Sequence, residues 1–191
     1  MNVLEQYAKI ALAEKLLRRR MRLTTVKFLT DLSHYMLTEI HREIAGNAAS
    51  AGRQKSTSTI LSSDTRRSEA SIFIKIYLHI GGDPVWTEFD IEAFIRSYDV
   101  HCESMSRMAA ARMAGEYEQE ININYAWALA RDIRSNVLRR RKCHRCKIPY
   151  VYLDSEPHTK CPLCATLVEL PRTAPARRYN APDAHSAPGS S

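Results

Sequence analysis

Long apolar runs are missing from this chain of 191 residues. Nowhere do about 18 apolar residues follow one another, which is the least that a membrane-spanning helix requires. Charges at Glu5, Lys9 and Glu14 interrupt the N-terminal stretch, so it lacks the apolar core of a signal peptide. We therefore expect a cytoplasmic protein with no membrane partner, whose cysteines lie in a reducing compartment.

The sequence also lacks the motifs of the common enzyme classes and any internal repeat. It contains no phosphate-binding loop, no Gly-x-Ser-x-Gly nucleophile elbow and no dinucleotide-binding fingerprint. The stretch EIHREIAG (39–46) resembles a metalloprotease helix only superficially, because it has no His-Glu-x-x-His motif. Acidic pairs such as Asp90 and Glu92 are typical of solvated helix faces. We therefore expect a protein that is not an enzyme.

Cysteine is scarce, but four of the five cysteines fall within one stretch, CHRCKIPYVYLDSEPHTKCPLC (143–164). Its two Cys-x-x-Cys pairs are separated by 14 residues. Each pair can turn both sulfurs toward one ion, and four thiolates can close a tetrahedron around Zn²⁺. Because four protein ligands leave no open position for water or substrate, we expect one structural zinc ion per chain. The predicted ligands are Cys143, Cys146, Cys161 and Cys164.

A redox dithiol or a pair of disulfides is the alternative for these cysteines. A thioredoxin-like dithiol needs a βαβ frame, and none surrounds this stretch. Each Cys-x-x-Cys pair is expected to form a tight turn, here called a knuckle. The spacer favours a hairpin that joins the two knuckles, since YVYL (150–153) is β-prone and DSEP (154–157) is typical of a turn. His144 and His158 lie nearby but are not needed as ligands. Cys102 stands apart and fits a small buried apolar residue.

Positive charge is concentrated at the two ends of the chain. The net charge of +7 divides into +4 over residues 1–22, −3 over residues 23–138 and +6 over residues 139–191. Clustered arginine and lysine favour contacts with nucleic-acid phosphates, although a solvated face or basic helix ends give the same pattern. The predicted phosphate contacts are Arg18, Arg19, Arg20, Arg22, Arg139, Arg140, Arg141 and Lys142.

The recurrence of apolar residues with a period close to 3.6 predicts a mainly α fold. The polar segment 47–64, rich in small residues, is expected to be a loop. We expect a helical domain that binds DNA or a partner over 1–140, a small zinc-ribbon-like module over 141–170 and a disordered tail over 171–191. Helices are predicted over 2–20, 24–45 (two short helices that break around 33–35), 65–80, 87–113 and 116–140.

Residues 24–45 fit a helix-turn-helix, in which a second helix enters the major groove of DNA, and fit a plain helical hairpin equally well. Ser33 lies where it can cap that second helix. Exposed residues of the second helix, Thr38 and Arg42 among them, are predicted to contact DNA. A plain amphipathic hairpin gives a similar pattern, and Asp31 occupies a turn that usually holds glycine. The apolar residues that such a unit buries are Val26, Leu32, Leu37 and Ile40.

Four stretches carry a resemblance to a known family. They are RLTTVKFLTDLSHYMLTEIHREIAG (22–46), ILSSDTRRSEASIFIKIYLHIGG (60–82), YAWALARDIRSNVLRRRKCHRC (125–146) and CPLC (161–164). Together they resemble the FlhC family, whose members join FlhD in the bacterial activator of flagellar genes. The resemblance implies a mainly helical protein in which the four clustered cysteines hold zinc. It also implies a complex with FlhD-like subunits that binds promoter DNA and recruits RNA polymerase to flagellar operons.

One segment departs from the family pattern. The loop 47–64 keeps Ser62-Ser63-Asp64 but lacks the usual prolines, and Thr65 stands where family members have tryptophan. The sequence favours a flagellar activator subunit, and three alternatives stay open. These are a diverged regulator of non-flagellar genes, a zinc-ribbon adaptor that binds only protein, and a nucleic-acid-processing enzyme with convergent carboxylates that the sequence does not reveal.

Overall fold

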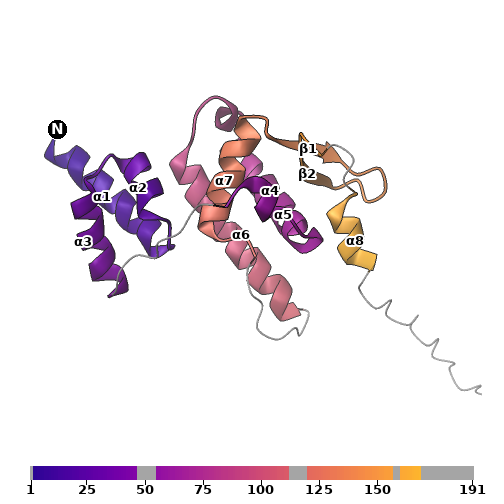
Figure 1. The fold of residues 1–191 in the computed structure, drawn as a ribbon, viewed down its shortest axis with the longest axis horizontal. Coiled ribbons are helices and arrows are strands. Elements are labelled where there is room, and N and C mark those ends of the chain that lie inside the picture. Colours follow the sequence, from indigo (N-terminus) through magenta and orange to yellow (C-terminus); the bar gives the residue numbers. More distant parts are fainter. Residues whose placement is uncertain (1, 47–54, 112–119, 157–159, 169–191) are drawn as a thin grey trace, which may run out of the picture.

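The fold is mainly helical, which confirms the predicted fold class (Figure 1). The computed structural model describes residues 2–46, 55–111, 120–156 and 160–168. No helix in these ranges is long and apolar enough to span a membrane. The predicted tail 171–191 lies outside them. The described elements are α1 (Val3–Arg18), α2 (Leu23–Thr30), α3 (His34–Ala45), α4 (Thr57–Ile60), α5 (Asp64–Gly81), the 3₁₀ turn η1 (Asp83–Trp86), α6 (Ile91–Ala111), α7 (Ile123–Arg134), β1 (Leu138–Lys142), β2 (Pro149–Leu153) and α8 (Pro162–Val168).

The first three helices pack against one another and form one end of the molecule (Figure 1). Leu16 of α1, Val26 of α2 and Leu37 of α3 are fully buried. Leu32 in the turn is also buried, whereas Ile40 is half-buried against the same core. The predicted inner face of the helix pair is therefore confirmed, with Ile40 at its margin.

The turn between α2 and α3 is fixed by its own residues. Asp31 adopts a left-handed backbone (φ 56°) and ends α2. Ser33 caps α3, because its Oγ accepts a hydrogen bond from the backbone N–H of Met36 at 3.2 Å. The predicted cap at Ser33 is thus confirmed. Asp31 takes the left-handed conformation that glycine more often supplies at this position.

Helices α5, α6 and α7 form the larger part of the molecule. The helices predicted over 65–80 and 87–113 are present as α5 and α6, and η1 precedes α6. Glycine is required at the end of α5, because a Cβ atom on Gly81 would lie 2.1 Å from Cγ1 of Val85. The close approach of η1 to α5 therefore depends on this glycine.

Polar contacts join the three-helix end to the larger part. Arg19 donates two hydrogen bonds to Asp99 of α6, at 2.8 and 2.7 Å. Asn124 at the start of α7 accepts from the backbone N–H of Arg22 at 3.0 Å and donates to the carbonyl of Arg20 at 3.1 Å. One hydrophobic core includes residues of both parts, so the end of α1 is held against α6 and α7.

The helix predicted over 116–140 is wrong at its C-terminal end. The helix α7 ends at Arg134, and the basic run that follows forms β1, paired antiparallel with β2. Asn136 has a left-handed backbone (φ 61°), which turns the chain out of the helix. Leu138 faces Leu153 across the hairpin, and both enter the main core. Packing across the strands therefore outweighs the helix propensity of an arginine-rich run.

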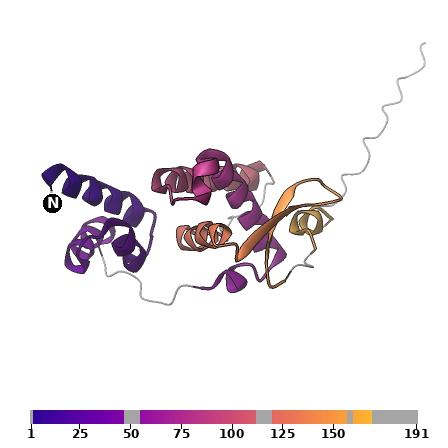
Figure 2. The same cartoon turned by 90° about the horizontal axis from the view of Figure 1, so that it is seen from above.

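The hairpin also differs from the predicted one, because its strands flank the first Cys-x-x-Cys pair and the spacer supplies only β2. The outer edge of β2 lies on α5, where the Val151 N–H donates to Ser71 Oγ at 3.1 Å. The helix α8 packs against α5 as well (Figure 2). Strand β1 crosses the boundary between the expected parts 1–140 and 141–170, and that division stays a prediction.

A short helix, α4, interrupts the predicted loop 47–64. Ser56 caps α4 through its Oγ, and Thr57 Oγ1 donates a hydrogen bond to the buried carboxylate of Asp132 on α7. These hydrogen bonds fix the polar segment around α4 against α7, a contact that hydropathy alone does not predict. Residues 47–54 of the predicted loop lie outside the described residues.

A buried carboxylate holds α5, α6 and the residues before α7 together. Glu69 of α5 is 3% exposed, and its oxygens accept hydrogen bonds from the backbone N–H groups of Glu120 and Ile121, each at 3.1 Å. Its Oε1 also lies 3.1 Å from Nε2 of His101 on α6, a fully buried ring. These partners offset the cost of burying an acidic side chain.

Replacing Glu69 by alanine should therefore lower the free energy of unfolding by about 3 kcal/mol, because several buried donors lose their acceptor. Lys75, exposed on the same helix, provides the control. Lys75→Ala should change the free energy by no more than about 0.5 kcal/mol. Urea denaturation measures both, and equal values for the two variants would contradict the role assigned to Glu69.

Candidate metal centre and nucleic-acid surface

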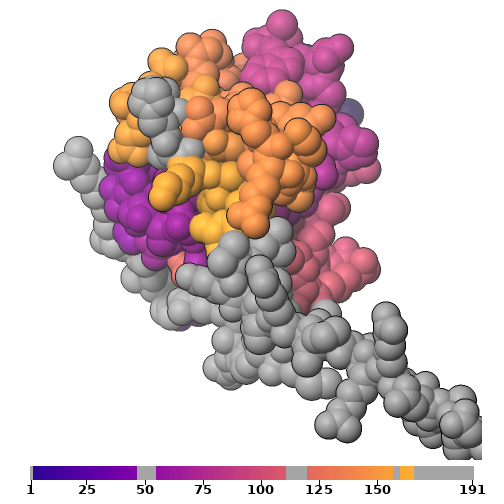
Figure 3. All heavy atoms as spheres, turned by 90° about the vertical axis from the view of Figure 1, so that its right-hand side faces the viewer, coloured from indigo at the N-terminus to yellow at the C-terminus, as the bar shows by residue number. Residues whose placement is uncertain are grey.

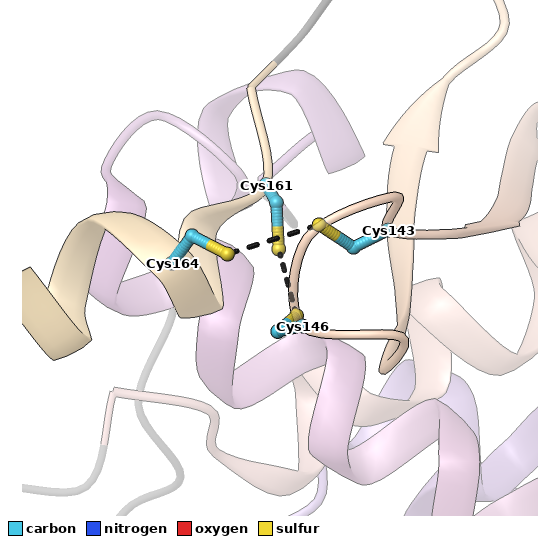
Figure 4. A group of neighbouring side chains, drawn as sticks. All are labelled: Cys143, Cys146, Cys161 and Cys164. Carbon is cyan, nitrogen blue, oxygen red and sulfur yellow. Dashed lines mark hydrogen bonds between the residues drawn. The ribbon is translucent and has the colours of Figure 1, made fainter.

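Two separate segments bring the four clustered cysteines together (Figure 4). Cys143 follows β1, Cys146 lies in the turn toward β2, Cys161 precedes α8 and Cys164 lies in the first turn of α8. All four sulfurs lie within 4.8 Å of one another. The sulfurs of Cys143 and Cys164 are 3.7 Å apart, and those of Cys146 and Cys161 are 3.8 Å apart.

These separations match a metal centre better than a disulfide. A tetrahedron of sulfurs about 2.3 Å from a central ion has edges of about 3.8 Å. A disulfide bond is about 2.05 Å long, and all four cysteines are free thiols. The four cysteines are therefore positioned to bind a metal ion, as the spacing predicted.

The backbone of the first knuckle holds its two cysteines in place. The Cys143 N–H donates to the Ile148 carbonyl at 3.1 Å, and the Lys147 N–H donates to the Cys143 carbonyl at 3.0 Å. Lys147 has a left-handed backbone (φ 62°), which lets the chain reverse within a few residues. The Arg145 N–H points at the Cys143 sulfur, 3.4 Å away. A two-residue gap between the cysteines is what this tight reversal requires.

The second knuckle opens a helix and docks on the hairpin. Pro162 occupies the first position of α8, where the missing N–H costs no helical hydrogen bond. Tyr150 of β2 is buried against Cys143 and Cys161, in a small apolar cluster beside the main core. Among the predicted bystanders, His144 is exposed, and His158 lies outside the described residues.

The surroundings move the pKa values of the thiols apart. Backbone N–H groups, first that of Cys146 and then that of Arg145, lower the pKa of the Cys143 thiol to about 6. Burial raises the pKa of the Cys161 thiol to about 12 and also raises the pKa of Cys164. Binding of a metal ion to four thiolates must therefore release protons, so metal affinity falls as the pH is lowered.

Two of the arginines predicted to contact phosphates are engaged within the hairpin. Arg139 Nε donates to Asp154 Oδ1 at 3.1 Å. The Arg141 guanidinium lies over the rings of Tyr150 and Tyr152, 5.2 and 4.7 Å from their centres. Cation–π contacts of this kind stabilise the pairing of the two strands. Both arginines therefore have a structural role in the described part of the chain.

Five basic residues around the cysteines are more accessible. Arg140 and Lys142 are exposed on β1, as the phosphate prediction requires. Arg145, Lys147 and Lys160 are also exposed, and sequence analysis missed them. Their position next to the predicted ligands is the signal that could have found them. None of the five makes an ion pair within the described ranges.

The N-terminal basic run lies at the junction with α6 and α7. Arg18 is paired with Glu14 at 2.7 Å. A hydrogen bond from Arg19 to its carboxylate partner on α6 raises the pKa of that guanidinium. Arg20 is exposed and has a left-handed backbone (φ 63°), while Arg22 is half-buried. Arg19 in particular links the three-helix end to α6 through its hydrogen bonds with Asp99.

The proposed reading helix, α3, lies at the opposite end of the molecule from the hairpin (Figure 1). Thr38 is half-buried, and its Oγ1 donates to the His34 carbonyl at 2.8 Å. Arg42 is exposed and donates to both carboxylate oxygens of Glu39, at 2.8 and 2.9 Å. Both residues are thus within reach of a ligand laid along α3.

Comparisons with known proteins identify the family. The sequence model of the family described as "Flagellar transcriptional activator (FlhC)" matches residues 1–179. "Flagellar transcriptional regulator FlhC" from Verminephrobacter eiseniae is 26% identical over 165 residues, which cover 85% of this chain and 84% of the relative. The protein of the same description from Nitrosomonas eutropha is 25% identical over 189 residues, covering 96% of this chain and 92% of the relative. The resemblance noted in the sequence is confirmed, and the chain belongs to the FlhC family of flagellar transcriptional regulators.

Proposed function

We propose that this chain is the DNA-binding subunit of a flagellar transcriptional activator that works in the cytoplasm. It acts with an FlhD-like subunit in a hetero-oligomer, binds promoter DNA and recruits RNA polymerase to motility operons. The observation that carries this proposal is the family match over residues 1–179, which includes both the three-helix end and the cysteine cluster.

The metal in this proposal is one zinc ion with a structural role. Four thiolates form a soft donor set that favours zinc, and the sulfur separations suit its tetrahedral geometry. The ligands are Cys143, Cys146, Cys161 and Cys164, which fill every position around the ion. The ion joins the end of β1 to the start of α8 and so stabilises the packing of both on α5.

The DNA-reading element in this proposal is α3. The turn before it holds three residues, and the helix before the turn is supported by α1, as in helix-turn-helix units. Thr38 and Arg42 are the side chains that we assign to base edges. Arg20, Arg22, Arg140 and Lys142 are assigned to phosphates.

The partner in this proposal binds the N-terminal half of α1. Val3, Leu4 and Tyr7 are 80%, 76% and 74% exposed, which is unusual for neighbouring apolar side chains on one helix. Val3 lies seven residues before Ile10 and fourteen before Leu17, so it continues the face of α1 that is buried further along the helix. An FlhD-like subunit that covers Val3, Leu4 and Tyr7 would complete a core that this chain leaves open.

A diverged regulator of non-flagellar genes is a second candidate. It is favoured by Thr65, which is exposed in the first turn of α5 where family members have tryptophan. Loss of a large exposed ring changes the surface that a partner or promoter meets at that point.

Zinc binding gives a direct test of the metal site. Purified protein should contain one zinc ion per chain, and Cys146→Ser or Cys161→Ser should lose it, because three ligands hold zinc far less tightly than four. Elemental analysis measures the stoichiometry, and circular dichroism measures the accompanying loss of structure. Chelators should remove zinc more readily as the pH falls below neutral, since protons then compete with zinc for the thiolates.

Cys102→Ser is the matched control, since Cys102 lies outside the cluster and is half-buried on α6. It should keep one zinc ion per chain. Full zinc retention in both ligand variants would refute the four-cysteine site.

Promoter selectivity tests the reading helix. The zinc-loaded complex with the FlhD-like subunit should bind a flagellar promoter more tightly than a random-sequence duplex. Thr38→Ala or Arg42→Ala should reduce this preference by about 1–3 kcal/mol each, because each removes a contact to base edges. The dependence of binding on salt should stay nearly unchanged for Thr38→Ala. Fluorescence anisotropy over a salt series measures both quantities.

Arg96→Ala on α6 removes an exposed arginine away from α3 and is the control, which should keep the promoter preference. If the wild-type complex bound promoter and random duplexes equally well, the proposed function would be wrong.

A further inference from the structure

Basic side chains flank the cysteines of both knuckles. Lys142 precedes Cys143, Lys147 follows Cys146 and Lys160 precedes Cys161. Neighbouring Cα atoms are about 3.8 Å apart, so each of these basic side chains is attached to the backbone about 3.8 Å from the Cα atom of a predicted ligand. Because the four sulfurs lie within 4.8 Å of one another, convergence of the ligands brings the attachment points of these cations around one centre. The hairpin (orange) and α8 (yellow), which carry the ligands, lie side by side on the face shown in Figure 3.

Arg145, inside the first knuckle, completes a set of four exposed cations with Lys142, Lys147 and Lys160, here called the knuckle cations. None of them makes an ion pair within the described ranges. Several exposed or half-buried basic residues elsewhere in the described chain, Arg18, Arg66 and Arg107 among them, instead have an acidic partner. The knuckle cations are therefore available to an anion from outside the chain.

The negative charge of a zinc ion with four thiolates is too small to neutralise the positive charge of the knuckle cations. Residues 139–160 carry seven basic and two acidic side chains, a net charge of +5. A zinc ion with four thiolates has a formal charge of −2, which leaves a net charge of +3 at this end. One of the two acidic residues, Asp154, is already paired with Arg139. The surplus is positive and is presented on exposed side chains.

The backbone beneath the knuckle cations is fixed before any ligand binds. Two backbone hydrogen bonds close the knuckle, and Arg141 is stacked over Tyr150 and Tyr152 on the adjoining strands. A surface that is already ordered loses less conformational freedom when it binds.

We infer that the metal centre organises the knuckle cations into a surface that binds the phosphate backbone of duplex DNA. The inference rests on the proposed function and deepens it by assigning phosphate contacts to Arg145, Lys147 and Lys160, with Lys142. Lysine ammonium groups act as point charges, so this surface positions the DNA and does not read its bases. The metal thereby contributes to DNA binding through the shape of the knuckles.

A charge-removal variant tests the inference in the zinc-loaded complex of the full chain with its FlhD-like subunit. Arg145→Gln combined with Lys147→Gly removes two cations, and glycine suits the left-handed backbone at 147. The slope of log affinity against log salt should become shallower by about 1.8, or about 0.9 for each lost contact. Promoter and random-sequence duplexes should be weakened to the same extent, because phosphates carry no sequence information.

Arg96→Gln combined with Arg107→Gln is the matched control. It removes the same charge from exposed positions on α6 and should leave the slope unchanged. Elemental analysis of every variant verifies that zinc is bound. Lys142→Gln combined with Lys160→Gln gives the same test from outside the knuckle turn if the first pair loses zinc.

The outcomes separate this inference from the proposed function. A shallower slope in a zinc-loaded knuckle variant, with an unchanged slope in the α6 control, supports the inference. Wild-type slope and affinity in the zinc-loaded knuckle variants would overturn it while leaving the proposed function intact. A wild-type complex that binds no promoter DNA would overturn the proposed function itself.

Discussion

The convergence of four cysteine sulfurs within 4.8 Å is the constraint on which the C-terminal half of the protein depends. The first knuckle turns the chain back so that an arginine-rich run becomes β1 beside β2. The paired strands then place Leu138, Val151 and Leu153 in the main core, and Ser71 of α5 receives the free edge of β2. The cysteine-bearing segments are thus built into the helical protein, and a metal ion at the thiols acts on the same packing.

Features that depend on short-range patterns were predictable from the sequence. The two Cys-x-x-Cys pairs specify their own convergence, and Ser33 before a run of helix-forming residues specifies a cap. Features that depend on distant partners were not predictable. Arg19 pairs with Asp99, 80 positions further along the chain. The buried carboxylate of Glu69 accepts a hydrogen bond from the backbone of Glu120, 51 positions further along. Strand β1 belongs to the second class, since its conformation is set by cross-strand register and not by its own residues.

The same distinction explains which of the predicted phosphate contacts the proposed function retains. A run of arginines has the same charge wherever it folds, but the fold decides which guanidinium groups are already used. Arg19 and Arg141 are engaged by a carboxylate and by tyrosine rings, whereas the exposed cations beside the cysteines are not. In the proposed function, a reading helix at one end and a phosphate-binding surface at the other place two contacts far apart on one duplex. Such a division favours a larger complex, in which a partner sets the relative position of the two ends.

Mapping where the chain binds on the chromosome tests the central claim most directly. The chain is crosslinked and recovered from growing cells of the bacterium that encodes it, in parallel from cells that lack the FlhD-like subunit. The account predicts peaks upstream of flagellar operons that disappear in the absence of that subunit. Peaks confined to non-flagellar promoters would instead establish the diverged regulator. Recovery of no specific chromosomal sites from cells that express a stable, zinc-loaded chain would contradict the account.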